Sequence, residues 1–339
     1  MTEAVPWREQ FGLVEGFVFL VLMLMFVRAA VTNYESPDHY LGRTMPAWQM
    51  EIVGGTAPAP YVYRQGVPQL RRLVMTVLQP GHAALAVDAG FAVIALGAGF
   101  ALGVYGLGRG RGMWGMVAAY VAAAGVYTND KPESVAMVAA IVLVTACFLH
   151  KHYQTAALAL VVSAAFRPEL PILFGGAVLM AAFVARRSIR PAGGLPLSLI
   201  PFGACVFAGL AYLAVCKFLL WPQAKYPQDT PAFMLMDNFT RPLGYPGMAL
   251  NLMIIAFGFG WIINAWRLLK PAAQSSANDS AINPTEVAHQ IAMGLFIATW
   301  SAAATVLGRT DEIRIVIPLL PLIFILASLR WLVWRRVKP

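Results

Sequence analysis

The sequence predicts an all-α integral membrane protein with about ten transmembrane helices. Hydrophobic residues make up 59% of the 339 residues and charged residues only 12%, whereas soluble domains carry about 25% charged residues. Apolar runs of helical length recur along the whole chain, which favours a helical bundle over a β-barrel. We therefore expect a single polytopic transmembrane domain that covers residues 1–339.

The predicted spans alternate with short polar turns. Several are shorter than the ~20 residues that a bilayer requires, and merging two of the third to sixth spans would lower the count to eight or nine. The first span could instead be read as a cleaved signal peptide. An uncleaved helix is favoured because the apolar run is longer than a signal core and no clearly positive segment precedes it. The spans are residues 13–31, 83–107, 113–127, 135–149, 155–166, 170–184, 195–220, 247–266, 291–307 and 315–334.

Between the first two spans lies a long polar segment, residues 33–82, which we interpret as the first outer loop. It carries acids, aromatic residues and arginines. Within it, residues 67–78 form an amphipathic juxtamembrane helix, with Arg71 and Arg72 off its apolar side. Such a helix is expected to lie in the interface plane, with its positive charge near lipid head-group phosphates. Its apolar side consists of Leu70, Leu73, Val74, Val77 and Leu78.

The distribution of basic residues predicts the orientation. With ten spans, the almost purely basic loops all fall on one side, which the positive-inside rule makes the cytoplasm. Both termini are then cytoplasmic, and the Ser-, Asn- and Ala-rich residues 267–290 form a flexible cytoplasmic loop. This bias explains the net charge of +9, so we expect no nucleic-acid partner. The predicted location is the bacterial inner (plasma) membrane.

Loops on the opposite side mix acids with arginines, which suggests a polar cavity at the outer surface. Arginine side chains bind phosphate bidentately, and a carboxylate can deprotonate an acceptor hydroxyl. Asp88, near the outer end of the second span, fits either a functional carboxylate, in a cavity or a proton relay, or a plain interfacial acid. The three cysteines lie inside apolar runs and are interpreted as packing residues.

Five short motifs fall in these outer loops. Asp38 follows the first span, and Asp130-Lys131-Pro132-Glu133 forms the second outer loop. The others are a Tyr-x-x-Arg-x-x-x-Pro pattern in residues 61–68, Phe166-Arg167-Pro168-Glu169, and Arg309-Thr310-Asp311-Glu312-Ile313-Arg314. With its long first outer loop and short later loops, the layout resembles membrane glycosyltransferases of the GT-C type.

The resemblance implies a sugar donor linked to polyprenyl phosphate and an acceptor at the outer face. It implies that Asp38 is the general base, with Asp130 and Glu133 orienting the reacting groups or a metal. A divalent metal is allowed but not required. The implied partners are the lipid-linked donor and membrane lipid, and a partner subunit is left open. The substrate- and phosphate-binding residues implied are Tyr63, Arg64, Arg167, Glu169, Arg309 and Arg314.

Two other function classes remain open beside the favoured enzyme. One is a transporter or flippase of a lipid-linked or anionic solute, and the other is a non-catalytic membrane scaffold subunit. An outer-face cavity reached from lipid favours the enzyme, whereas a midplane site in broken helices favours transport. A closed, fully paired charge network favours the scaffold.

Overall fold

The structure is a computed structural model, and every element in the part that it describes is helical. It describes residues 11–34, 45–59, 61–108, 110–127, 134–188, 200–224, 234, 238, 240, 245–272, 284–307 and 316–337. Within these ranges, five helices are long and apolar enough to cross a membrane, which indicates an integral membrane protein. The corresponding segments are Leu13–Thr32, Pro80–Leu107, Ile200–Leu220, Tyr245–Trp266 and Val287–Leu307.

The long helices match predicted spans, with shifted ends. They are α1 (Leu13–Tyr34), α4 (Pro80–Leu107), α9 (Ile200–Ala214), which continues into a π-helix η5 (Val215–Leu220), α11 (Tyr245–Ala272) and α12 (Pro284–Leu307). The shorter helices are α5 (Gly112–Tyr127), α6 (Ser134–Leu149), α7 (Tyr153–Ser163), α8 (Glu169–Ser188) and α13 (Leu320–Val337), the last preceded by a 3₁₀ turn η8 (Ile317–Leu319).

The predicted cytoplasmic loop over residues 267–290 was wrong at both ends. Helix α11 continues to Ala272, and α12 already begins at Pro284. Arg267 and Lys270 therefore lie within helix α11 and not in a loop. Residues 273–283 lie outside the described part.

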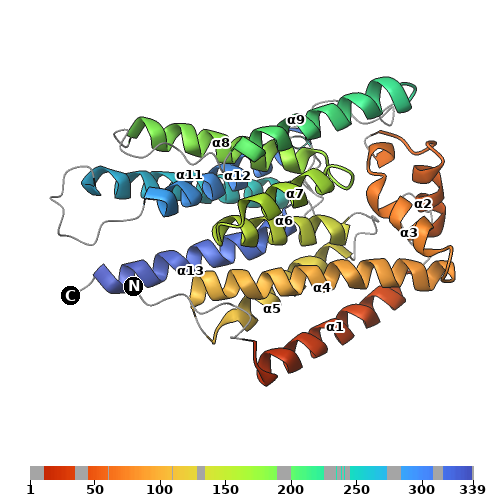
Figure 1. Ribbon diagram of the computed structural model, residues 1–339, viewed down its shortest axis with the longest axis horizontal. Helices are drawn as coiled ribbons and strands as arrows, with labels where there is room; N and C mark the ends of the chain where they lie inside the picture. Colours follow the sequence, from red (N-terminus) through yellow and green to blue (C-terminus); the bar gives the residue numbers. More distant parts are fainter. Residues whose placement is uncertain are drawn as a thin grey trace.

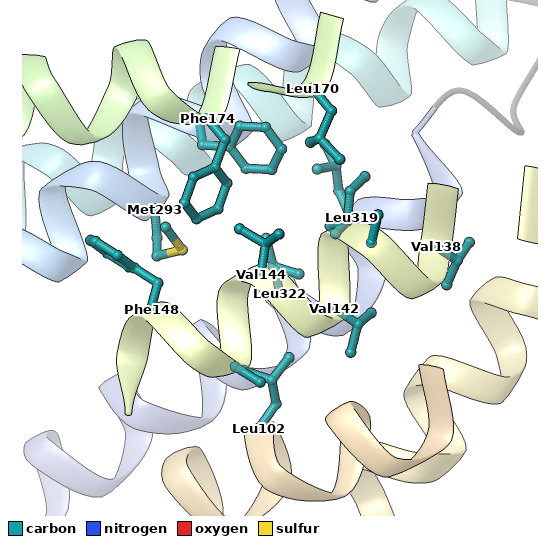
Figure 2. Close-up of a cluster of buried hydrophobic side chains, with 14 of the residues drawn as sticks. Leu102, Val138, Val142, Val144, Phe148, Leu170, Phe174, Met293, Leu319 and Leu322 are labelled. Atoms are coloured by element: carbon teal, nitrogen blue, oxygen red, sulfur yellow. The ribbon is translucent and has the colours of Figure 1, made fainter. Parts of the chain in front are cut away.

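At the centre of the bundle lies α6, whose residues are almost all buried. A helix that is apolar on every side is stable only where neighbours surround it or in lipid. Figure 2 shows Val144 and Phe148 of α6 facing Phe174 of α8 and Met293 of α12, with Leu102 of α4 on the other side. By contrast, only 17% of the apolar segments Leu13–Thr32 and Ile200–Leu220 is buried inside the protein, as expected of helices that face lipid.

The contact between α4 and α5 depends on glycine. A Cβ added to Gly99 would lie 2.6 Å from the backbone oxygen of Gly115, and one added to Gly103 would lie 2.7 Å from that of Gly112. Helices in membranes pack closely through such small residues, because dispersion contacts rather than hydrophobic exclusion hold them together.

Replacing Gly99 by Ala is expected to destabilise the protein by about 1–3 kcal/mol, because the added methyl group overpacks the α4–α5 contact. Gly97 on the same helix is the matched control, since a Cβ there meets nothing within 4 Å. Gly97→Ala should be neutral or slightly stabilising, given the higher helix propensity of alanine. Denaturant titration of both variants in detergent measures the difference, and equal stabilities would contradict the close packing.

Residues 45–74 form a compact cap at one end of the bundle (Figure 1). The cap contains α2 (Met45–Val53), a 3₁₀ turn η3 (Tyr61–Tyr63) and the amphipathic helix α3 (Gly66–Val74). It lies beside the first turns of α4, and the opposite end of the bundle holds the end of α13. The cap has a small core of its own around Trp48, Ile52 and Val62.

Candidate functional site

The cap meets two other chain segments that are distant in sequence. The backbone N–H of Gly66 donates to the carbonyl oxygen of Ala165, 2.9 Å away, at the turn between α7 and α8. The end of α9 also joins the cap, because Cys216 belongs to its core and Trp221 packs against it. Three predicted outer segments, namely the first loop, the α7–α8 turn and the end of α9, therefore converge at one end of the bundle.

Gly66 makes this contact feasible. A Cβ at this position would overlap the ring of Phe166 and approach the backbone of Ala165. Behind it, the Gln65 side chain donates hydrogen bonds to the carbonyl oxygens of Ile52 (2.7 Å) and Val62 (2.8 Å). The two residues between η3 and α3 are thus held from both sides, which fixes the position of Arg64.

Arg64 is buried, with only 5% of its surface exposed. Its guanidinium carbon lies 5.3 Å from the centroid of the Tyr61 ring, within the range of a cation–π interaction. One terminal nitrogen lies 3.5 Å from a carboxylate oxygen of Glu169, across 105 residues of sequence. The arginine head is therefore held by an aromatic face and by a carboxylate.

Arg167 and Glu169 belong to the turn that opens α8. The Arg167 backbone is fixed by hydrogen bonds to Ser163 (2.7 Å) and from Leu170 (2.9 Å), and its side chain is buried. Glu169 stands in the first helical turn, where a negative charge interacts favourably with the helix dipole. Partial burial opposes its ionisation, with 41% of the side chain exposed, but the nearby Arg64 and Arg167 outweigh that effect and hold the pKa of the Glu169 carboxyl below its usual range. The result is a cluster of two arginines and one ionised carboxylate.

Tyr63 lies in the apolar core of the cap with 5% of its surface exposed. Its carbonyl oxygen accepts a 2.9 Å hydrogen bond from the hydroxyl of Tyr212 on α9. The ring that lies against the arginine head is that of Tyr61. Of the two tyrosines in the Tyr-x-x-Arg pattern, the first therefore contacts the charged cluster directly.

A second buried charge pair lies between the cap and α4. A terminal nitrogen of Arg71 lies 2.6 Å from each carboxylate oxygen of Asp88, and both side chains are 1% exposed. The other terminal nitrogen of Arg71 donates a longer hydrogen bond, 3.5 Å, to the side-chain oxygen of Gln49 on α2. Tyr34, at the end of α1, also lies within the field of this charge pair. Burial raises the pKa of its phenol, the Arg71 charge lowers it, and the Asp88 charge raises it.

This pairing corrects the expectation for Arg71. Its side chain is directed into the protein and not toward lipid head groups, whereas Arg72 is exposed. Asp88, for which two interpretations were open, is the buried partner of this arginine.

Of the predicted site residues, the structure places Arg64 in contact with Glu169 and the Arg167 charge near that carboxylate, whereas Tyr63 lies in the core of the cap. The other predicted residues, Asp38, Asp130, Glu133, Arg309 and Arg314, lie outside the described residues. Within the described ranges, no group of three or more His, Cys, Asp and Glu side chains is placed to hold a metal ion.

Sequence reasoning missed the parts played by Tyr61, Gly66 and Tyr212. The spacing of Tyr61 from Arg64 was a usable signal, since three residues in a 3₁₀ turn bring two side chains onto one face. Gly66 and Tyr212 act through contacts with remote segments, for which a single sequence holds no local signal.

Comparison with protein-family models, curated proteins and solved structures finds no match to this chain.

Proposed function

We propose that the protein is a membrane glycosyltransferase that moves a sugar from a polyprenyl-phosphate donor to an acceptor at the outer face of the membrane. The observation that carries the proposal is the cluster of Arg64, Arg167 and Glu169, which joins the cap to the end of the helix bundle. Two buried guanidinium groups near lipid-facing helices suit a phosphate that carries a long isoprenoid chain.

The reaction would proceed by displacement at the anomeric carbon. The acceptor hydroxyl oxygen forms the new bond to that carbon, and the bond from the carbon to the phosphate oxygen breaks. The hydroxyl proton passes to a carboxylate, for which the sequence offers Asp38. Arg64 and Arg167 would stabilise the negative charge that develops on the departing polyprenyl phosphate. Glu169 would hold the two arginine heads in place.

The proposal also includes the number and orientation of the membrane-spanning helices. Ten helices cross the membrane, both termini are cytoplasmic, and the cap faces outward in a bacterial inner membrane. The roles of Asp130 and Glu133 in orienting the reacting groups, and of Arg309 and Arg314 in binding phosphate, belong to the same proposal.

Arg64→Gln is expected to raise the KM for a polyprenyl-phosphate sugar about 10- to 100-fold, because a hydrogen bond to a charged group contributes about 1.5–3 kcal/mol. The matched control is Arg72→Gln, which removes an exposed arginine from the same cap. Purified variants in nanodiscs, assayed with radiolabelled donors, give the comparison. An Arg64→Gln enzyme with unchanged KM would contradict the phosphate-binding role.

The competing functions predict other outcomes in the same nanodiscs. A transporter or flippase would move the lipid-linked sugar between leaflets without breaking its bond to phosphate. A scaffold subunit would do neither. Buried charged side chains in the described part are Arg64, Arg71, Asp88 and Arg167, all in the cap or in segments packed on it. This distribution supports chemistry at the membrane surface over a transport site at the midplane.

A further inference from the structure

The amphipathic helix α3 has three distinct sides. At about 100° per residue, Val67, Pro68 and Arg71 fall together on the side buried against the protein. Gln69 and Arg72 share an exposed polar side. Leu70 and Leu73 share an exposed apolar side, with 36% and 65% of their surfaces exposed. The exposed half of the helix is therefore divided into a polar and an apolar edge.

The Arg71–Asp88 pair fixes how this helix is rotated. One guanidinium nitrogen of Arg71 is held by both oxygens of the Asp88 carboxylate, and because both side chains are 1% exposed the helix has little freedom to turn. With Arg71 held inward, Leu70 and Leu73 must point away from the protein. A helix held only by its apolar face would show the opposite arrangement, with the leucines buried.

The pair also fixes the depth of α3. Helix α4 has 28 residues and so is about 42 Å long, compared with ~30 Å for the hydrocarbon core. Asp88 lies eight residues after the first residue of α4, or about 12 Å along the axis. With α4 centred in the bilayer, this level is about 6 Å inside the core boundary. Val67 packs at the same level, in one cluster with Val87 and near Phe91, which lie on either side of Asp88 along α4.

We infer that the exposed apolar edge of α3, Leu70 and Leu73, docks on membrane lipid, and that the Arg71–Asp88 pair is the anchor that holds it there. The depth argues for lipid as the occupant, because exposed leucines at this level meet acyl chains rather than water. Arg72 and Gln69, on the opposite edge, face the aqueous side. This inference concerns lipid contact alone and does not depend on the proposed transfer reaction.

Nitroxide labels on two neighbouring positions test it. Leu73→Cys and Arg72→Cys are each labelled in a background where Cys147, Cys205 and Cys216 are replaced by Ala, and the protein is placed in phospholipid nanodiscs. The label at 73 is expected to collide more often with dissolved oxygen, which concentrates in the bilayer, than with a water-soluble nickel chelate. The label at 72 should show the reverse preference.

Two results would overturn the inference. A label at 73 as accessible to nickel as that at 72 would place the leucines in water. A label at 73 shielded from both agents would mean that protein covers this edge. Photo-crosslinking from benzoylphenylalanine at position 73, with the native cysteines kept, gives an independent reading: phospholipid adducts support the inference, and adducts to protein alone contradict it.

The anchor is tested separately with the double variant Arg71→Met/Asp88→Leu, which removes both charges together. The preference of the label at 73 for oxygen over nickel is expected to fall toward that of the label at 72, because the rotation of α3 is no longer fixed. An unchanged preference in the folded double variant would show that the pair is not the anchor.

Discussion

Replacing Asp38 by Asn is expected to lower the rate of sugar transfer by about 10²- to 10⁴-fold, the range that general base catalysis contributes. The amide keeps the size of the carboxylate but cannot accept the proton of the acceptor hydroxyl. Donor binding should change little, because the phosphate is assigned to Arg64 and Arg167. Turnover under saturating donor, measured in nanodiscs, is the quantity to compare.

Glu35→Gln is the matched control, since Glu35 is a second carboxylate in the same segment of the first loop. Both variants should elute and melt like the native protein, which separates a catalytic loss from misfolding. Native-like turnover in Asp38→Asn would end its assignment as the base. If the native protein transfers no sugar from any polyprenyl-phosphate donor, the enzyme proposal itself fails.

Asp88→Leu is expected to destabilise the folded protein by about 3–5 kcal/mol, because it leaves the guanidinium of Arg71 buried without its countercharge. Both side chains are 1% exposed, so water cannot replace the lost carboxylate. The loss should be read from the denaturant midpoint in detergent. Glu51→Gln, at a half-exposed acid of the same cap, should leave the midpoint nearly unchanged.

The double variant Arg71→Met/Asp88→Leu sharpens this test. Replacing both members of a buried pair with apolar residues of similar volume is often neutral or stabilising. Its stability should therefore return toward the native value. A double variant as unstable as Asp88→Leu alone would show that packing, and not the unpaired charge, causes the loss.

Composition alone predicted a helical membrane protein, because a chain this apolar has few other ways to form hydrogen bonds with all of its backbone N–H and C=O groups. The residues at which the helices begin and end were harder to predict. Residues 267–290 were predicted as a loop from their Ser, Asn and Ala content, but the first of them, Arg267 to Ala272, include two leucines and continue helix α11. The start of α12 at Pro284 could have been predicted from the sequence, since proline is favoured in the first helical turn.

For the site, alternation of spans could place Arg64 and Glu169 on the same face of the membrane, but not in contact. Their 3.5 Å approach depends on Gly66 meeting Ala165, a packing detail between segments 99 residues apart. Arg71 was predicted near lipid head-group phosphates because amphipathicity assigns every charge to the polar side of the helix. Its true partner, Asp88, stands on the next helix, and the pattern within α3 carries no sign of it.

The enclosure of α6 has a consequence for biogenesis. Its partners Phe174, Met293 and Leu322 belong to helices that are synthesised after it. During translation α6 must therefore reside among lipids before those helices arrive, and its uniformly apolar surface allows this. Assembly of the bundle then exchanges lipid for protein around a helix that is already inserted. A single ionisable residue in α6 would be penalised twice, first in lipid during insertion and again in the finished core.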